Sequence, residues 1–391
     1  MEGVERARES VVVRPVLTRR DLSAFINVPH HVYQDDPAWI PPLRLERRLH
    51  LSPRHNAYFQ HAYWRGWVAS RDRQPVGRIS AQIDELERQH HGADRGQFGF
   101  LDATDDRSVF AALFNAAEEW LLAEGAHRIR GPFNFSINQE CGLLVDGFEH
   151  PPMVMMGHGR PYYEAHLRHL GYAPAKDLLA LWIESDFEHP PVMQSLLKRY
   201  ARRIRVRPMN GGDVGEEFEL LRTIFNDAWA NNWGFVPFTE AEFSEIGKQL
   251  RMLVSDDLVQ IADVDGVAAA FMICLPNLNE AIRDLDGRLF PFGWAKALWR
   301  LRRRRVRTGR IALMGVRRQY HDSPLGAALA MSVIGATQAP TLRQGIEGAE
   351  LSWILEDNGG LLNILETLGA RPYKRYRIFE KTLPATSASD G

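Results

Sequence analysis

The sequence predicts a mixed α/β protein, with mixed α+β sheets, built from two successive units of similar element order. Segments with strand-like apolar patterns alternate with amphipathic helical segments along the whole chain. The second half repeats the first half's order of hairpin, strands and crossover helices. A chain of 391 residues is also long enough for two domains of ordinary size.

Composition excludes several classes of protein. The chain is 45% hydrophobic and 25% charged, which is ordinary for a soluble globular protein. Its net charge of −1 gives no broad positive field, so we expect no nucleic-acid partner. Cys141 and Cys274 lie far apart and outside any CxxC pattern, so we expect no metal site, no disulfide and a cytoplasmic location. No apolar run of membrane-spanning length and no secretory h-region occur.

The first unit, residues 1–185, contains one strong helix signal. Its predicted elements are a short helix at 21–27, a hairpin at 65–84, a strand at 96–103, a helix at 108–125, a strand from 127, a helix at 162–172 and a strand at 177–184. In the helix at 108–125, apolar residues recur at helical spacing, Ser108 is the expected N-cap and Gly125 the expected stop.

The second unit, residues 186–384, follows a proline-containing linker at 185–192. Its predicted elements are helices at 216–234 and 239–253, a hairpin at 258–276, a strand at 310–316, a helix from 325, a strand at 349–356, a helix at 359–369 and a closing strand. Thr239 and Glu242 form a capping box, and an Asp-Gly pair marks the hairpin turn. The small polar residues 385–391 predict a disordered tail.

The stretch VRRQYHDSPLGAAL, residues 316–329, combines a strand end, a loop and a helix start. Free N–H groups and the dipole at a helix N-terminus bind anions without a charged side chain. Pro324 removes one donor, but at the first helical position that N–H has no partner within the helix. The stretch therefore fits either an anion cradle or an ordinary helix start.

The second unit resembles the GNAT acyltransferase superfamily, over residues 204–381. In that superfamily a loop Arg/Gln-x-x-Gly-x-Gly/Ala receives the pyrophosphate of coenzyme A, and residues 321–326 take these six positions here. The later segments ILEDN and LLNILETLGARPYKRYRIFEK match a strand ending in asparagine, a short helix and a paired closing hairpin. The resemblance implies two tandem GNAT-like modules, of which the C-terminal one carries the CoA loop.

The whole chain also resembles a bacterial group of two-module proteins that includes the bacterial ceramide synthases. The segments that carry this resemblance are residues 35–44, 75–84, 98–106, 130–152 and 225–243. The resemblance implies N-acylation of a long-chain (sphingoid) base by acyl-CoA, a cosubstrate rather than a permanently bound cofactor. Acylation of a small soluble amine or amino acid, or a non-catalytic acyl-CoA-binding scaffold, are the alternatives.

The resemblance also implies which residues bind acyl-CoA. Backbone N–H groups of the loop should hold the pyrophosphate, and nearby arginines should pair with phosphate. Asn358 is expected either to hold the pantetheine arm or to cap the following helix. The candidate CoA-binding residues are Val316, Arg317, Arg318, His321, Ser323, Leu325, Gly326, Ala327 and Asn358.

Catalysis requires a base for the ammonium, donors for the oxyanion and an acid for the leaving thiolate. Glu350 and Glu356 are candidate bases because six positions along a strand keep one face, and Glu140 lies in a polar loop. The resemblance implies a tyrosine that faces the thiolate, for which Tyr373 and Tyr376 are the candidates; alternatively, both pack within a strand. The resemblance to the GNAT superfamily implies that the oxyanion is met by a main-chain N–H at residues 314–316.

Two further features bear on a lipid substrate. The first unit lacks a glycine loop, so we expect it not to bind CoA but to form a wall of the acceptor pocket. Trp229, Asn231, Asn232 and Trp233 could line that pocket. Residues 290–310 combine aromatic residues with seven arginines, which is typical of an element at the inner-membrane surface, or of an insertion helix with a solvated face.

Overall fold

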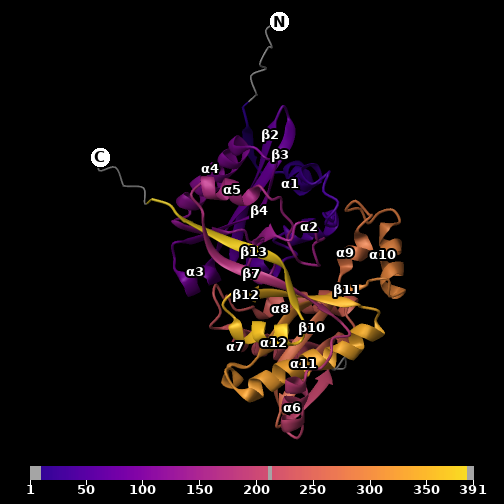
Figure 1. The fold of residues 1–391 in the computed structure, drawn as a ribbon. Helices are drawn as coiled ribbons and strands as arrows, with labels where there is room; N and C mark the ends of the chain where they lie inside the picture. Colours follow the sequence, from indigo (N-terminus) through magenta and orange to yellow (C-terminus); the bar gives the residue numbers. More distant parts are fainter. Residues whose placement is uncertain (1–9, 210–213, 385–391) are drawn as a thin grey trace.

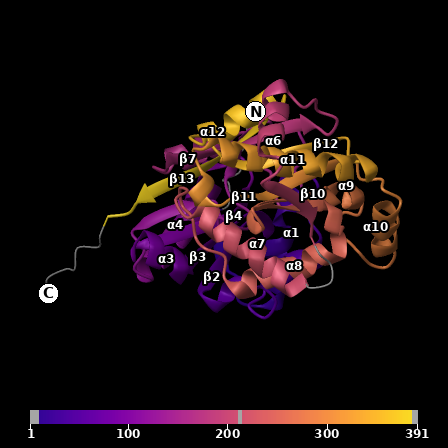
Figure 2. The ribbon, with the colours of Figure 1, turned by 90° about the horizontal axis from the view of Figure 1, so that it is seen from below.

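A single thirteen-stranded sheet runs through the computed structural model of the chain, which describes residues 10–209 and 214–384 (Figure 1). The predicted disordered tail at 385–391 lies outside the described residues. The mixed α/β class predicted from the sequence is confirmed, because helices cover both faces of this sheet. In the second half, α7 and α8 lie on one side of the strands and α11 and α6 on the other (Figure 2).

The first half begins at the edge of the sheet and ends near its centre. Its elements are β1 (Val12–Pro15), α1 (Arg19–Val32), α2 (Arg44–His50), β2 (Ala62–Arg71), β3 (Gln74–Asp84), α3 (Glu85–His91), β4 (Arg95–Ala103), α4 (Arg107–Ala123), β5 (Arg128–Gly131), β6 (Leu143–Asp146), α5 (Tyr163–His169) and β7 (Ala173–Glu184). The N-cap of α4 is Asp106, whose carboxylate accepts from the Ser108 N–H at 2.8 Å. The prediction that Ser108 caps this helix was therefore wrong.

The second half begins with a helix that starts inside the predicted linker. Its elements are α6 (Pro191–Tyr200), β8 (Ile204–Pro208), α7 (Val214–Trp229), α8 (Glu240–Leu253), β9 (Val259–Val264), β10 (Val267–Pro276), α9 (Leu278–Ile282), α10 (Gly293–Arg302), β11 (Thr308–Val316), α11 (Pro324–Arg343), β12 (Gly348–Leu355), α12 (Gly359–Thr367) and β13 (Arg371–Thr382). The capping box is confirmed, because the Glu242 N–H donates to Thr239 Oγ1 and the Thr239 N–H donates to the Glu242 carboxylate. The Asp265–Gly266 turn is confirmed as well, with both φ angles positive.

The strand order shows that the two halves exchange strands. The order is β1-β2-β3-β4-β5-β13-β7-β12-β11-β10-β9-β8, with β6 also paired to β13. The last strand of the chain thus lies between β5 and β7 of the first half, and β7 pairs with β12 of the second. The expected closing hairpin is wrong, because β13 pairs with strands of the first half. The bounds of the two units, 1–185 and 186–384, stay a prediction.

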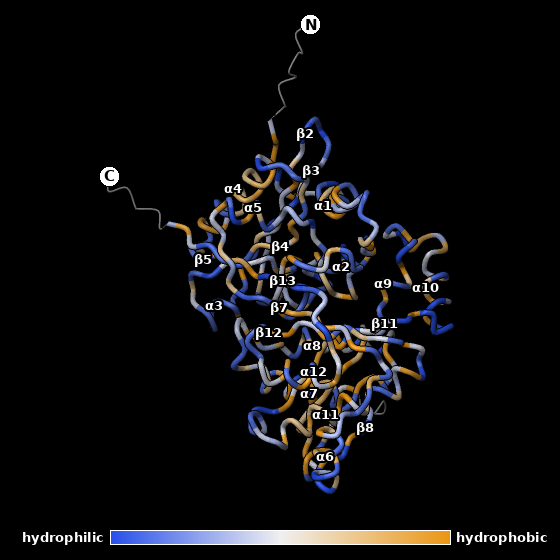
Figure 3. The backbone as a smooth tube through the Cα atoms, in the orientation of Figure 1, coloured by the Kyte–Doolittle hydropathy of each residue, from blue (hydrophilic) through white to orange (hydrophobic). Residues whose placement is uncertain are grey.

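Four apolar clusters fill the space between the sheet and the helices. Two belong to the first half, one belongs mainly to the second, and the fourth joins Phe133 and Leu144 to Leu355 and Tyr376 across the two halves. One described helix, α11, has the length and hydropathy of a membrane span, and 61% of its most apolar window is buried (Figure 3). Because α11 packs on β8 to β11, we identify it as a core helix.

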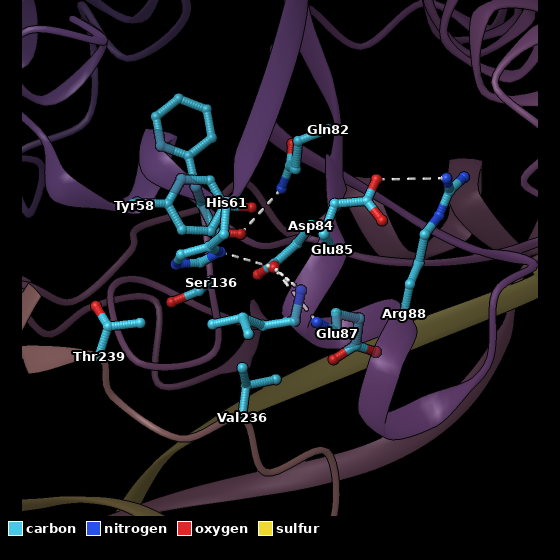
Figure 4. Close-up of polar contacts among 12 residues, drawn as sticks. Tyr58, His61, Gln82, Asp84, Glu85, Glu87, Arg88, Ser136, Val236 and Thr239 are labelled. Carbon is cyan, nitrogen blue, oxygen red and sulfur yellow. Dashed lines mark hydrogen bonds and ion pairs between the residues drawn. The ribbon is translucent and has the colours of Figure 1, made fainter.

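A buried polar cluster joins the halves at the edge of this core (Figure 4). His61 Nδ1 lies 3.0 Å from Asp84 Oδ1, and its Nε2 lies 3.5 Å from Glu242 Oε2 of α8. Burial alone would lower the pKa of His61, but the hydrogen bonds and charges of Asp84 and Glu242 outweigh it and raise the pKa to about 9. Burial raises the pKa of the neighbouring Glu87 carboxyl to about 7.

We predict that this cluster makes the free energy of unfolding depend on pH. The pKa of His61 is higher in the folded chain than its unfolded value of about 6.5, so its contribution is complete below that pH and lost as pH rises through about 9. The loss should reach at most about 3 kcal/mol. Denaturant unfolding between pH 6.5 and 9 should therefore show a decline that His61→Gln flattens.

The exposed His90 of α3 supplies the control. His90→Gln should leave the pH dependence as in the unmodified chain. An equally steep decline in His61→Gln would assign the dependence to other groups.

Candidate functional site

A groove opens where β11 and β12 separate. The two strands pair in parallel only from Thr308 and Gly348 to Ile311 and Leu351. Beyond these residues, β11 continues against β10 and β12 continues against β7. The β12-facing side of β11 past Ile311 therefore has no strand partner, and its backbone groups face the opening. We call this opening the splay groove.

The splay groove brings together most of the residues predicted to bind CoA. Its empty space, open mouth included, is about 1770 Å³. Its walls come from the end of α7, the end of β11, the start of α11, the end of β12 and the start of α12. The predicted residues that line it are Val316, His321, Ser323, Gly326, Ala327 and Asn358. Leu325, Arg317 and Arg318 are not among its lining residues.

The start of α11 uses part of the expected anion cradle for itself. Ser323 is the N-cap, and its Oγ accepts from the Gly326 N–H at 3.1 Å, while the Ala327 N–H donates to the Ser323 carbonyl. Pro324 occupies the first turn, as predicted. The N–H groups of Ser323 and Leu325 have no partner among the described residues. Fewer N–H groups are therefore free to bind an anion than the four that were expected. A Cβ on Gly326 would lie 2.1 Å from the Tyr320 carbonyl oxygen, which explains this glycine by close packing.

The polar side chains around the loop are also engaged. His321 Nε2 lies 2.7 Å from the Val316 carbonyl oxygen. Arg317 Nε donates to the Ala268 carbonyl at 2.8 Å, and Arg318 pairs with Asp227 on α7. These contacts fix the loop against the neighbouring strand and helix. Asn358 caps α12 through its side-chain oxygen, which accepts from the Leu361 N–H at 3.2 Å.

A second, mostly apolar space continues from the groove into the protein. The empty space of this inner cavity, its open side included, is about 880 Å³, and the cavity shares Trp229, Asn232, Trp233, Trp353 and Leu355 with the splay groove. Its other walls come from α7, the loop before α8, β10 and β11 of the second half, and from the segment 137–141, Met155 and Leu178 of the first half. Residues of the first half thus line this cavity, while their role as a wall of the acceptor pocket stays a prediction.

A bulge in β11 lies at the junction of groove and cavity. Ile273 of β10 faces Leu313 and the next residue, Cys274, faces Ile311, so Ala312 is left out of the ladder. A bulge leaves peptide groups of the extra residue unpaired. Ala312 and Leu313 line the inner cavity. The bulge therefore lies just before residues 314–316, where the oxyanion donor was expected.

Glu350 is the centre of a buried charged network. It is 0% exposed and accepts from Ser352 Oγ at 2.6 Å and from the Tyr373 hydroxyl. Lys374 Nζ lies 3.5 Å from its carboxylate and Arg310 Nε 3.9 Å. Burial lowers the pKa of Lys374 and of Arg310, against the charge of Glu350. Glu350 is thus satisfied by neighbours, and Arg310 is the network member that lines the inner cavity.

The other candidate catalytic residues lie in different places. Glu356 is exposed just past the end of β12 and accepts from the Asp177 N–H at 3.1 Å. A register shift between Leu351 and Ile354 breaks the alternation of β12, so the argument that placed Glu350 and Glu356 on one face fails. Tyr376 is fully buried and donates to the Gly157 carbonyl at 3.2 Å.

Neither predicted tyrosine faces the groove. Burial and the charge of Glu350 raise the pKa of the Tyr373 hydroxyl, and that hydroxyl donates to the same carboxylate. Tyr373 and Tyr376 are absent from the lining of the splay groove within the described part of the chain. Tyr373 therefore contacts Glu350, and neither tyrosine lies at the groove beside the loop that contains His321.

Glu140 belongs to a separate ion pair in the first half. It is paired with Arg47 and accepts from Asn134 Nδ2 at 3.1 Å. Burial by itself would raise the pKa of Glu140, but the charge and hydrogen bond of Arg47 bring the pKa down to about 2. The adjacent Cys141 is buried and free, and burial raises the pKa of its thiol. The thiol is therefore not activated as a nucleophile.

Several residues of the site carried no recognisable signal in the sequence. Arg310 and Lys374 lie within runs of basic residues, and only the fold shows that they are buried. The His158 side chain is only 4% exposed, its Nε2 lies 3.0 Å from Asp36 Oδ2, and its Nδ1 has no partner among the described residues. Burial lowers the pKa of His158, so the ring is neutral near pH 7.

The corresponding opening in the first half is filled by its own chain. β4 and β5 pair in parallel only over Arg95–Gln97, and the chain after β5 then covers the free edge of β4. The Phe133 N–H donates to the Phe98 carbonyl at 2.8 Å, and the Phe100 N–H donates to Asn134 Oδ1 at 2.6 Å. The two halves therefore differ: one opening is plugged and the other is free.

Comparisons with known proteins agree with this architecture. Protein YghO of Escherichia coli K12 is 51% identical over 373 residues, covering 95% of each chain. The bacterial ceramide synthase of Caulobacter vibrioides is 43% identical over 373 residues, covering 95% of this chain and 97% of that protein. A scan against models of known protein families finds no match.

Solved structures share the fold at low sequence identity. A tandem GNAT protein from the clavulanic acid biosynthesis pathway has a TM-score of 0.56 at 12% identity, covering 95% of this chain and 98% of that one. A GCN5-related N-acetyltransferase from Sphaerobacter thermophilus has a TM-score of 0.51 at 14% identity, covering 95% of both chains. The prediction of two tandem GNAT-like units is confirmed.

We predict that the Glu350 network contributes strongly to stability. Glu350→Gln keeps the side-chain shape but leaves the buried Lys374 and Arg310 without a carboxylate. Breaking one partner of a buried ion pair costs about 3–5 kcal/mol, so the free energy of unfolding should fall by about that amount. Glu356→Gln, exposed on the same segment, should change it by less than about 0.5 kcal/mol. Equal denaturation midpoints for the two variants would contradict the prediction.

Proposed function

The chain belongs to the bacterial tandem GNAT acyltransferase family that contains the ceramide synthase of Caulobacter vibrioides, and we propose that it N-acylates a long-chain (sphingoid) base with a fatty acyl group from acyl-CoA. The observation that carries this proposal is the apolar inner cavity that opens directly into the splay groove. A short acyl donor would leave this cavity unfilled. A fatty chain gains about 0.8 kcal/mol for each methylene group that it buries there.

The proposed reaction forms a C–N bond and breaks a C–S bond. The amine nitrogen attacks the thioester carbonyl carbon, the carbonyl oxygen becomes an oxyanion, and collapse of this intermediate expels the CoA thiolate. The unpaired backbone around Ala312 supports oxyanion stabilisation at the junction of groove and cavity. The CoA pyrophosphate would lie at the start of α11, where the N–H groups of Ser323 and Leu325 and the helix dipole favour an anion. Asn358 would contact the pantetheine arm.

The charge at the cavity wall favours a neutral amine. Arg310 faces the inner cavity with its guanidinium 4.7 Å above the Trp353 ring. A nearby positive charge lowers the pKa of a bound ammonium, so the nucleophilic form is favoured. We assign Glu350 the role of holding Arg310 and Tyr373 in place and propose it as the carboxylate that receives the proton. Glu140, whose pKa Arg47 holds at about 2, is the weaker base.

The decisive assay compares substrates of different chain length. Purified protein with palmitoyl-CoA and sphinganine should release CoA thiol and an amide detectable by mass spectrometry. Acetyl-CoA with the same base, or palmitoyl-CoA with a soluble amino acid, should react at least about a hundredfold less efficiently, since several buried methylenes are lost. Activity only with a soluble amine would instead support the alternative of a small acceptor. Acyl-CoA binding without turnover would support the non-catalytic scaffold.

We also propose that α10 places the enzyme on a membrane surface. Phe290 and Phe292 are 72% and 78% exposed, and Trp294 and Trp299 are about half exposed. Figure 1 shows α10 projecting at the side of the molecule. Large exposed apolar groups beside basic residues are typical of interfacial binding to anionic lipid.

The arginines at the end of α10 and just after it are partly free for such binding. Arg300 is paired with Asp284, and Arg305 lies 4.5 Å over the Trp299 ring. Arg302 and Arg303 have no acidic partner in the described parts of the chain. Each basic residue near an anionic surface contributes about 1 kcal/mol, and salt weakens this attraction.

We predict that the full chain sediments with phosphatidylglycerol vesicles. The double change Phe292→Ala with Trp294→Ala should reduce the bound fraction at least about fivefold, because two interfacial side chains lose their apolar burial. Leu17→Ala, at another exposed apolar residue, should leave binding unchanged. Binding that survives the double change, or that is equal on phosphatidylcholine vesicles, would remove α10 as the contact.

A further inference from the structure

Three internal spaces meet at one side chain, that of Met155. Besides the inner cavity, an outer pocket lies between α2 and α8, and a side pocket lies under α1, lined mainly by residues of the first half. The outer pocket is lined by His50 and Glu245 among others, and the side pocket by His158 and Glu140 among others. Met155 lines all three spaces.

The segment that carries Met155, residues 151–157, is held by side chains of the second half. Four of its carbonyl oxygens accept hydrogen bonds from that half. The bonds run from Lys374 Nζ to Pro151 (2.8 Å), from Asn279 Nδ2 to Pro152 (2.8 Å), from Arg310 Nη1 to Val154 (3.0 Å) and from the Tyr376 hydroxyl to Gly157 (3.2 Å). The backbone on both sides of Met155 is therefore fixed relative to the cavity, and two of the donors belong to the Glu350 network.

The backbone at Met155 adopts a conformation that most side chains avoid. Its φ of 60° is in the left-handed region, which β-branched residues tolerate poorly. Such a conformation persists when the surrounding structure determines it. An unbranched thioether is well suited to close an irregular gap between cavities. The combination gives a fixed attachment point with an adaptable side chain.

The walls change character at this side chain. On the groove side the inner cavity is mostly apolar, with Trp229, Phe225 and Leu355 among its lining residues. On the far side are the polar residues Glu140 and His158, whose side chains are 12% and 4% exposed. An alkyl chain that entered from the splay groove would gain apolar burial up to Met155 and less beyond it.

We propose that Met155 terminates the acyl-chain cavity and thereby sets the longest fatty acyl group that the enzyme transfers efficiently. This inference rests on the proposed long-chain acyltransferase function. The acyl chain is the occupant because the thioester lies where groove and cavity join, so the carbons after its carbonyl enter the cavity directly. The acceptor amine then approaches the same carbonyl from the polar side pocket, past Cys141, which both spaces share.

The test changes the volume of this side chain in both directions. Met155→Ala joins the inner cavity to its neighbours, and Met155→Phe shortens it. The measurement is kcat/KM for saturated acyl-CoA donors of increasing length with one fixed base, and then for bases of increasing length with one fixed donor. Met156→Ala is the matched control, since Met156 lies next in the chain but lines only the side pocket. Thermal unfolding of each variant verifies folding.

Each buried methylene is worth about fourfold in relative kcat/KM, so two carbons are worth about fifteenfold. Met155→Ala should raise by about fifteenfold the efficiency for a donor two carbons longer than the original optimum, relative to that optimum. Met155→Phe should shift the optimum to shorter donors, and Met156→Ala should leave it unchanged. Folded Met155 variants with an unchanged donor profile, or with a shift only in the base profile, would overturn the inference. Failure of the proposed function is distinct, because the unmodified enzyme would then make no long-chain amide at all.

Discussion

The antiparallel pairing of β7 with β13 is the contact on which the rest of the structure depends. β13 is the last strand of the chain, yet it lies between β5 and β7 of the first half, while β7 extends the sheet to β12 of the second. Pairing of this kind joins both halves through continuous backbone hydrogen bonds. The relative position of the halves is therefore fixed by the sheet, and the segments between β5 and β7 must pass over the open end of β11.

The same crossing explains where the buried charges lie. β13 carries Tyr373, Lys374 and Tyr376, and β12 carries Glu350, so these side chains meet where the two halves join. Without a partner, the charge of Lys374 or of Glu350 would be costly to bury. Together with the carbonyl groups of 151–157 they satisfy one another, and the network holds the first-half segment above the cavity. The site is thus a property of the joined sheet and of neither half alone.

Local signals in the sequence predicted most elements, and non-local pairing explains what they missed. The capping box at Thr239, the Asp265–Gly266 turn and the strand-loop-helix at 316–329 depend on neighbours in the chain, and each has the predicted form. The partner of β13 depends on a strand far away in the sequence, so the expected closing hairpin was wrong. The prediction that Glu350 and Glu356 lie on one face of β12 was wrong. It assumed that side chains alternate along the whole strand, and a register shift inside β12 breaks that alternation.

The openings in the two halves differ: the one in the first half is filled by the chain after β5, and the one in the second half is free. In both halves a parallel pair of strands separates, which leaves unpaired backbone that must be satisfied. In the first half the chain after β5 supplies the partners itself, and Gln82 Nε2 holds the plug by donating to the carbonyl groups of Phe133 and Phe135 at 2.8 and 3.0 Å. The residues that follow the plug, 137–141, then reach the inner cavity of the second half. Closing the opening of the first half thus supplies a wall for the inner cavity beside the splay groove of the second half.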